Sequence, residues 1–223
     1  MELPKDSVEI LPELIDEWRP QFISLFKSFV YSRRKNNIAR QNSRILPAAM
    51  PWIWEQALEG KLVSDQEIKN YILGSPDYRG VLDEDGNPID EHTRNCMFGA
   101  TDERIVECRS HNFFVGYMRE VNAFVHLSKK GRVFRSNFFD LKWDVDIILV
   151  DEYGSHTFAV RHHGAASIQH ERERKSLQSY PGVVTLRAAE SSTNRLDIFT
   201  KEEVENGVKE ARQRQASSSR CLA

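Results

Sequence analysis

Two short apolar runs separated by a turn, within residues 146–162, constrain the fold of this chain more than any other feature. The first run, 147–150, is continuously apolar, and the second, 156–162, alternates between apolar and other residues. A continuous run is typical of a strand that is buried on both faces, and alternation is typical of a half-buried strand. The connection, 151–155, is short enough for a tight turn, so we expect an antiparallel hairpin.

The segments on either side of the hairpin indicate an α/β domain. An apolar stripe at steps of three and four residues predicts a helix before it, and period-two alternation predicts a further strand between that helix and the hairpin. After the hairpin we expect a helix, a strand and a closing helix. The predicted segments are 111–131, 132–139, 167–180, 182–188 and 200–215. This order implies a mixed central sheet flanked by helices.

The N-terminal part of the chain has a different pattern and is expected to be mainly helical. Apolar residues recur at helical spacing over 8–31, where Pro20 is predicted to end one helix and begin the next. Shorter helices are expected at 51–60 and 64–74, the second opened by a capping box at Ser64. We therefore expect a mainly helical region over 1–109, an α/β core over 110–215 and a flexible tail over 216–223.

Composition is typical of a cytoplasmic globular protein. Of the 223 residues, 40% are hydrophobic and 29% are charged, and no apolar run approaches the ~20 residues that span a bilayer. The N-terminus carries acids early and lacks the basic and then apolar order of a signal peptide. Widely spaced cysteines with no CxxC pair indicate neither a disulfide framework nor a zinc site.

The net charge of -2 conceals a strongly polarised charge pattern. From residue 18 to 54 there are seven basic residues and no acid, and from 55 to 91 there are ten acids. A local basic block attracts polyanions even in a nearly neutral protein, and a solvated helix face beside an acidic neighbour explains the same residues. The candidates for nucleic-acid contact in this block are Arg33, Arg34, Lys35 and Arg40.

Two acidic residues next to apolar segments are candidates for a metal site. Asp146 begins the continuously apolar strand, and by alternation Asp144 lies on the same face. Acids at the mouth of a buried strand suit a hard divalent cation such as Mg²⁺, although a turn or capping acid has the same pattern. Glu120 flanks the apolar stripe of the preceding helix, where a carboxylate needs a cationic partner because an unpaired buried charge is costly. A metal ion or an arginine would serve, and a surface ion pair is the ordinary alternative.

The second strand of the hairpin carries a cation near these acids. Alternation places Ala159 and Arg161 on one face, on the same side as Asp146 if the hairpin pairs tightly. Arg161 offers a permanent positive charge to a phosphate or to one of the acids. On the following helix, Arg172 and Lys175 are three residues apart and share a face, which suits a backbone phosphate. A solvated face of mixed charge explains this last pair equally well.

The order of these motifs resembles the PD-(D/E)XK superfamily of metal-dependent nucleases over about residues 111–190. The motifs are a helix with Glu120 inside it, the strand D-I-I-L-V, a turn, and the strand F-A-V-R followed by a helix. The resemblance implies a restriction-endonuclease-like core and a DNA endonuclease that uses Mg²⁺ or Mn²⁺, as a subunit of a larger DNA-processing complex. Glu120 and Asp146 would bind the metal and act in catalysis together with Arg161. The implied partner is DNA, beside another protein or a second copy of the chain.

The resemblance is incomplete at the strand F-A-V-R. Ala159 stands where the superfamily has an acid, and Arg161 stands where it has a lysine. Members use the acid to bind Mg²⁺ and the lysine to orient water or stabilise developing charge. Either another carboxylate completes the site, with Glu120, Asp144 and Glu171 as candidates, or the site is natively degenerate, or the alanine results from a substitution. A degenerate site would leave a catalytically inactive module that binds nucleic acid or a protein partner. An unrelated α/β protein with structural acids is the third interpretation.

Overall fold

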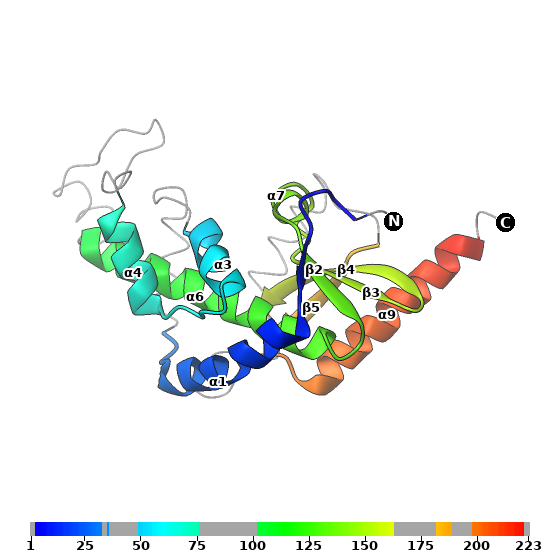
Figure 1. The fold of residues 1–223 in the computed structure, drawn as a ribbon, viewed down its shortest axis with the longest axis horizontal. Helices are drawn as coiled ribbons and strands as arrows, with labels where there is room; N and C mark the ends of the chain where they lie inside the picture. Colours follow the sequence, from blue (N-terminus) through cyan, green and yellow to red (C-terminus); the bar gives the residue numbers. More distant parts are fainter. Residues whose placement is uncertain are drawn as a thin grey trace. The chain divides into compact units, whose positions relative to one another are not determined.

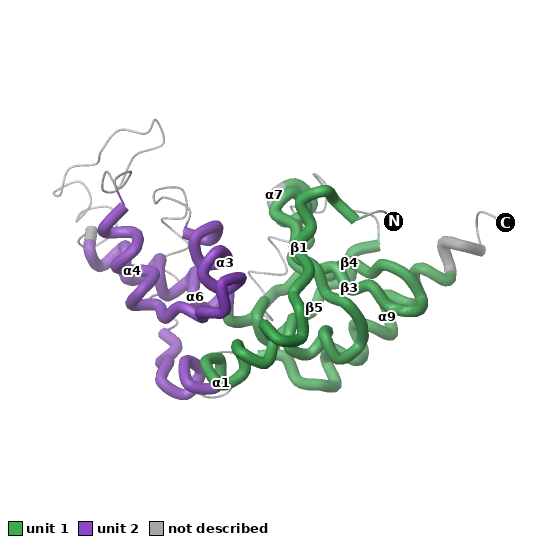
Figure 2. The backbone as a smooth tube through the Cα atoms, in the orientation of Figure 1, with its two compact units in different colours: residues 1–22, 118–223 green, residues 23–117 purple. Residues whose placement is uncertain are grey.

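The structure is a computed structural model that describes residues 3–32, 35, 49–75, 102–162, 182–188 and 198–220 (Figure 1). The chain forms two compact units: residues 1–22 with 118–223 make up unit 1, and residues 23–117 make up unit 2 (Figure 2). Unit 1 contains the sheet and the hairpin that the sequence predicts. Within the ranges described, no helix has both the length and the apolarity of a membrane-spanning segment.

Unit 1 is built on a five-stranded mixed sheet, as the predicted α/β fold class requires. The strands follow one another across the sheet in chain order: β1 (Val8–Ile10), β2 (Arg132–Arg135), β3 (Ile147–Asp151), β4 (Gly154–His162) and β5 (Val184–Ala188). The first four strands pair antiparallel, and β5 pairs parallel with β4. Strands β3 and β4 form the predicted hairpin, with Ile147 opposite Phe158 and Asp151 opposite Gly154.

The predicted helix over 8–31 is wrong at its N-terminal end. Val8–Ile10 form strand β1, which pairs with β2 so that Val8 lies opposite Arg135 and Ile10 opposite Val133. An ion pair from Glu9 to Arg132, with Nη2 and Oε2 2.5 Å apart, joins the same two strands. Helical spacing of apolar residues is a local signal, and it cannot reveal a strand whose partner is distant in the sequence.

Pro20 does not divide the helix, contrary to the prediction. Helix α1 (Pro12–Ser28) is continuous and contains Pro20 in its interior. A proline inside a helix removes one backbone hydrogen bond and costs about 3 kcal/mol. Ile15 and Trp18 are fully buried in the turns that precede it, and the Trp18 ring packs edge-on against Phe124 at a centroid distance of 6.3 Å. Tertiary burial of one helix face therefore outweighs the local penalty.

The predicted strand over 132–139 is correct only in its first half. Strand β2 ends at Arg135, and helix α7 (Asn137–Trp143) begins directly after Ser136. The Ser136 hydroxyl accepts a hydrogen bond from the Phe139 amide at 3.1 Å, so Ser136 is an N-cap that stops the strand. Asp6 accepts from the Ser136 hydroxyl at 2.7 Å and from the Phe138 amide at 2.8 Å, which satisfies further free donors of the first turn.

Both long helices extend beyond their predicted bounds. Helix α6 (Asp102–Leu127) begins before the predicted start at 111, and α9 (Lys201–Arg220) continues past the predicted end at 215. The predicted helix over 167–180 lies outside the described residues.

The two faces of the sheet are covered differently. Helix α9 packs on β5 and β4, where a Cβ atom added at Gly207 would lie 2.4 Å from Leu186 Cδ2. On the other face, Phe134, Val145 and Ile148 form a buried apolar cluster with Phe139 of α7. Helix α9 thus covers one face of the sheet, and the short helix α7 covers part of the other. Polar groups line the end of the sheet near residue 146.

Unit 2 is helical, and its described residues include α3 (Met50–Leu58), α4 (Asp65–Gly74) and the first part of α6. The predicted capping box is confirmed: Ser64 accepts from the Glu67 amide at 3.2 Å, and the Glu67 carboxylate accepts from the Ser64 amide at 2.8 Å. Trp54 is buried and packs edge-on against Tyr117 with ring centroids 5.5 Å apart. An aromatic core therefore holds the α3 helix to α6 within this unit.

Candidate functional site

Asp146 is held at the mouth of β3 by three hydrogen bonds to β4. Its amide donates to the Phe158 carbonyl at 2.9 Å. Its carboxylate oxygen Oδ2 accepts from the Val160 amide at 2.5 Å and from Arg161 Nη1 at 2.9 Å. Only 6% of the residue is exposed. Both of these side-chain hydrogen bonds go to Oδ2, so the second oxygen, Oδ1, is the one that the hairpin does not use.

Arg161 is the centre of an ion-pair network that includes both acids at the start of the hairpin. Besides Asp146, its guanidinium contacts the carboxylate of Asp144, and it donates to the Asp144 carbonyl at 3.3 Å and to the Val160 carbonyl at 2.6 Å. The Arg161 side chain is 20% exposed. Burial lowers the pKa of the guanidinium but the two carboxylates outweigh it and raise the pKa, so Arg161 stays a cation.

Asp144 reaches Arg161 because of its backbone conformation. It is the C-cap of α7 and has φ 57°, in the left-handed region that few residues other than glycine adopt. Its amide donates to the Asp140 carbonyl at 3.1 Å, which closes the helix. A short polar residue tolerates this conformation better than a bulky one does. The turn that ends α7 therefore directs a carboxylate and a carbonyl to the same guanidinium.

Glu120 brings a carboxylate from α6 to the same place. Its oxygen Oε2 is buried and has no hydrogen-bond partner among the described residues. Burial raises the pKa of Glu120 well above the ordinary value, and the carboxylates of Asp146 and Asp140 raise it further. A buried carboxylate oxygen without a donor is costly, while the charges of Arg135 and Arg161 favour the ionised form of Glu120.

These residues form a buried ion cluster with an excess of acids. Arg135 is the second cation, and its Nη2 lies 3.1 Å from Asp140 Oδ2. The carboxylates belong to Glu120, Asp140, Asp144 and Asp146, and the guanidinium groups belong to Arg135 and Arg161. Four carboxylates therefore face two guanidinium groups, and Arg187 of β5 is partnered with Arg161 in the sheet and adds a third cation.

Burial, with a smaller contribution from neighbouring carboxylates, disfavours the ionised forms of the acids in the cluster. Burial raises the pKa of Asp146 to about 6, although the Arg161 guanidinium opposes the shift. Burial also raises the pKa of Asp140, where Arg135 opposes and Asp144 adds to the shift. A cation bound beside these acids would favour their ionised forms.

The alanine at position 159 faces a polar row on the neighbouring strand. Ala159 lies opposite Thr185, and Arg161 lies opposite Arg187, in the parallel pairing of β4 with β5. Partnered residues of adjacent strands point to the same side of a sheet, so the side chain of Arg187 leaves the backbone next to that of Arg161. Burial lowers the pKa of Arg187, and the charge of Arg161 lowers it further. Sequence reasoning missed Arg187 because only the register between β4 and β5 brings it next to the hairpin.

The sequence-predicted cations fall into two groups. Arg33, Arg34, Arg40, Arg172 and Lys175 lie outside the described residues. Lys35 is described and belongs to unit 2, where its Nζ atom is 2.6 Å from Glu107 Oε1. Its charge is therefore engaged in an ion pair within that unit.

The residues present fit Mg²⁺ or Mn²⁺ in one arrangement. In the described part of the chain, no three His, Cys, Asp or Glu side chains converge closely enough to enclose a metal ion. Mg²⁺ is commonly held by one or two carboxylates, with water and substrate phosphate completing its shell. Among the described residues Glu120 Oε2 has no hydrogen-bond partner, and the hairpin contacts Asp146 through Oδ2 and not through Oδ1. Glu120 and Asp146 are thus suited to an ion shared with a substrate, and Ala159 contributes no ligand.

Comparison of the chain with protein-family models, with curated proteins and with solved structures gives no match in any of the three. The assignment of function therefore depends on the geometry of unit 1.

Proposed function

We propose that this chain is a Mg²⁺-dependent DNA endonuclease of the PD-(D/E)XK type, with Glu120 and Asp146 as the metal ligands. The observation that carries the proposal is that these two carboxylates lie in one buried cluster, where Glu120 Oε2 has no hydrogen-bond partner among the described residues and Arg161 fixes Asp146. The order α6, β2, β3 and β4 also follows the order of the motifs in the family resemblance. A larger complex with a further protein or a second copy of the chain is part of the same proposal.

The bound metal would polarise the scissile phosphate and lower the pKa of an attacking water. Asp146 is positioned for metal binding because the Val160 amide and Arg161 hold its Oδ2 and orient the carboxylate. Arg161 replaces the usual lysine only in its electrostatic role, since a guanidinium stays charged and cannot accept a proton from water. Its contact with Asp144 fixes the guanidinium at the edge of the cluster, where a phosphate oxygen could replace one carboxylate as its partner.

The missing carboxylate at Ala159 should lower the affinity of the site for Mg²⁺. With two protein ligands instead of three, Mg²⁺ binds weakly to the free protein and more tightly when DNA phosphate completes its shell. We expect Mg²⁺ affinity to rise when non-cleavable duplex DNA is present, because each ligand then stabilises the binding of the other.

The test of this function is cleavage of supercoiled plasmid and of labelled duplex, nicked and single-stranded DNA with Mg²⁺ or Mn²⁺. Asp146→Asn and Glu120→Gln should each reduce the rate by about a hundredfold or more, because each removes one of two ligands. Glu202→Gln, an exposed acid in the first turn of α9, is the matched control and should cleave at the wild-type rate. Equal cleavage by wild-type and Asp146→Asn protein would disprove the assignment.

A second candidate function is a catalytically inactive module that binds nucleic acid. The observation that favours it is Arg161, whose Nη1 already supplies a positive charge to both Asp146 Oδ2 and the Val160 carbonyl. In this case no metal-dependent cleavage occurs, and DNA binding weakens when Arg33, Arg34 and Lys35 are neutralised together. DNA binding that is unchanged in this triple variant would argue against a role for the basic block.

A further inference from the structure

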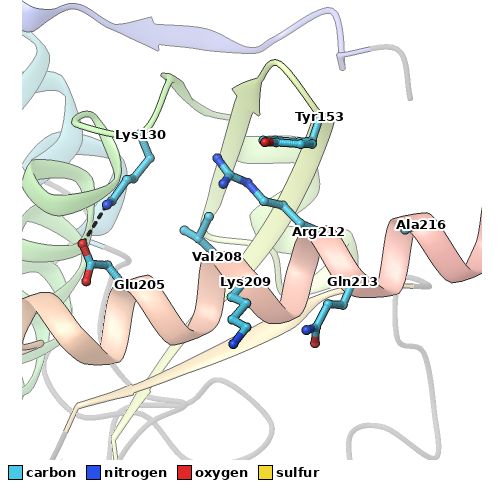
Figure 3. Close-up of a pocket in the computed structure, with 8 residues that line it drawn as sticks. All are labelled: Lys130, Tyr153, Glu205, Val208, Lys209, Arg212, Gln213 and Ala216. Atoms are coloured by element: carbon cyan, nitrogen blue, oxygen red, sulfur yellow. Dashed lines mark hydrogen bonds and ion pairs between the residues drawn. The ribbon is translucent and has the colours of Figure 1, made fainter.

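A second polar site lies at the opposite end of the β3–β4 hairpin from Asp146. Asp146 precedes β3, whereas the turn that follows Asp151 joins β3 to β4. Five strand residues separate the two ends by roughly 16 Å. Between this turn, the end of α6 and helix α9 lies an open pocket with a volume of about 550 Å³ (Figure 3). Its walls include Lys130, Tyr153, Glu205, Val208, Lys209 and Arg212, which all belong to unit 1.

The guanidinium of Arg212 is fixed in the pocket wall by a buried acid. Its Nε and Nη2 atoms donate to the same oxygen of Asp151, Oδ2, at 3.0 and 2.8 Å. The Asp151 side chain is only 2% exposed. Its other oxygen, Oδ1, accepts from the Tyr153 amide at 2.8 Å and lies 3.0 Å from His156 Nε2. Because Asp151 is held on several sides, the position of Arg212 is set before any ligand arrives.

Tyr153 extends the same wall with an aromatic surface. The Arg212 Cζ atom lies 4.3 Å from the centroid of the Tyr153 ring, which places the cation over one face of the ring. The residue is 57% exposed, so much of the tyrosine remains open to solvent. Figure 3 shows Val208 and Arg212 rising from α9 on the side of the hairpin turn that carries Tyr153. The pocket thus joins an apolar floor, a flat ring and a fixed cation.

The turn that bears Tyr153 is fitted closely to α9. Gly154 has φ +122°, a conformation that side chains with a Cβ atom rarely adopt. A Cβ atom at Gly154 would lie 2.4 Å from Gln215 Nε2 on the helix. The positive φ therefore favours glycine at this position of the turn, next to Tyr153.

The charge of the pocket favours an anionic ligand. The lining residues include the cations Lys130, Lys209 and Arg212 and a single carboxylate, Glu205. Glu205 is already engaged, since its Oε1 atom lies 2.8 Å from Lys130 Nζ. Lys209 is exposed on α9. Arg212 is paired with Asp151 and Lys130 with Glu205, so Lys209 is the lining cation that gives the pocket its net positive charge.

We propose that this pocket binds a nucleoside phosphate, either as a free nucleotide or as one residue of a single-stranded nucleic acid. A nucleotide combines a flat aromatic base, which would stack beside Tyr153 over Val208, with a phosphate group for Arg212 and the lysines. The pocket volume lies within the range of small-ligand sites. This inference does not depend on the endonuclease proposal, because it uses neither Asp146 nor Glu120.

Binding is measured by fluorescence anisotropy of full-length protein, with labelled adenosine triphosphate in one arm and a labelled short oligothymidylate in the other. Tyr153→Ala should weaken binding about fivefold to a hundredfold, which is the usual effect of removing a stacking platform. Lys209→Glu should weaken it several-fold, because the charge at the pocket is reversed. Both side chains are at the surface, and a melting curve for each variant shows whether the fold is kept.

The matched controls are Phe138→Ala, an exposed aromatic residue on α7, and Lys5→Glu, an exposed lysine in unit 1. Both should bind like the wild type. Loss of binding in Tyr153→Ala for either probe supports the pocket, and the probe that binds more tightly identifies the source of the nucleotide. The proposal is overturned if neither probe binds, if Tyr153→Ala binds both unchanged, or if inorganic phosphate competes as well as adenosine triphosphate does.

Discussion

Arg161 and Arg187 occupy partnered positions on the parallel strands β4 and β5. Their side chains therefore leave the backbone side by side, on one face of the sheet. Arg161 is bound by the carboxylates of Asp144 and Asp146. The charge of Arg161 contributes to lowering the pKa of Arg187, after burial. Two adjacent guanidinium groups suit a ligand that carries negative charge, and a DNA phosphate is such a ligand.

Arg187→Gln should therefore weaken the binding of duplex DNA without changing metal binding. We expect the slope of log affinity against log salt concentration to fall by about one, since one phosphate contact is lost. Arg132→Gln is the control, because Arg132 is an exposed arginine of the same unit that is paired with Glu9. Fluorescence anisotropy over a series of salt concentrations gives the slope for each variant. A salt slope for Arg187→Gln that equals the wild-type slope would remove Arg187 from the DNA-binding surface.

Replacing Arg161 should reduce stability more than replacing a surface arginine does. Arg161→Gln leaves Asp146, with a 7% exposed side chain, without its cation. Breaking a buried ion pair from one side costs about 3 kcal/mol in the free energy of unfolding. Urea denaturation gives this value, and the double variant Arg161→Gln with Asp146→Asn should recover part of the loss. Additive losses in the double variant would show that the two side chains do not interact.

The buried ion cluster predicts that Mg²⁺ stabilises the protein through Glu120 and Asp146. At a tenfold excess of Mg²⁺ over Kd, the gain in the free energy of unfolding is about 1.4 kcal/mol. For a protein of this size the corresponding rise in Tm is roughly 3–6 °C. Glu120→Gln should abolish the rise, while it makes the metal-free protein more stable than the wild type because one buried charge is removed. Differential scanning fluorimetry with and without Mg²⁺ checks both effects, with Glu202→Gln as the control.

The β3–β4 turn should be a site of acid sensitivity. Burial raises the pKa of Asp151, but hydrogen bonds from Arg212, the Tyr153 amide and His156 outweigh it, and the pKa lies below the ordinary value of 3.8. A depressed pKa in the folded state contributes stability above the unfolded pKa, and this contribution is lost as the pH falls through the folded value. Asp151→Asn should therefore lower Tm at pH 7 and show a smaller further loss than the wild type below about pH 4. Glu152→Gln, the exposed neighbour in the same turn, should follow the wild-type curve.

Within unit 1, the elements that could be predicted from the sequence are those that pair with the next element along the chain. The β3–β4 hairpin is such a part, because its two strands and its turn are contiguous and the alternation of 156–162 defines a face. Strand β1 could not be predicted, since its pairing with β2 joins Glu9 to Phe134 across most of the chain. The helical spacing that follows β1 cannot be told apart from it in the sequence, because three residues are too few to show a period of their own.

The candidate site shows the same limit. Asp146 and Arg161 were found because the hairpin places both at one end. Arg135 and Asp140 were missed, because their ion pair needs the chain to change from strand to helix at Ser136. Arg187 was missed because parallel register depends on the connection between β4 and β5 and not on either strand alone.

Restoring a carboxylate at position 159 separates the two candidate functions. Ala159 is 5% exposed and lies opposite Thr185, on the face of β4 that carries Arg161. A carboxylate there would add a third ligand beside Asp146, so Ala159→Glu should raise Mg²⁺ affinity by roughly tenfold, as measured by calorimetry. If the wild-type protein is an endonuclease with two metal ligands, cleavage is present before the change and increases after it. An inactive module would gain metal binding without cleavage from Ala159→Glu alone, because Arg161 still occupies the lysine position.

Ala159→Ser, which adds an oxygen without a charge, is the control and should leave Mg²⁺ affinity near the wild-type value. If Ala159→Glu also leaves the Mg²⁺ affinity unchanged, the metal binds away from this strand.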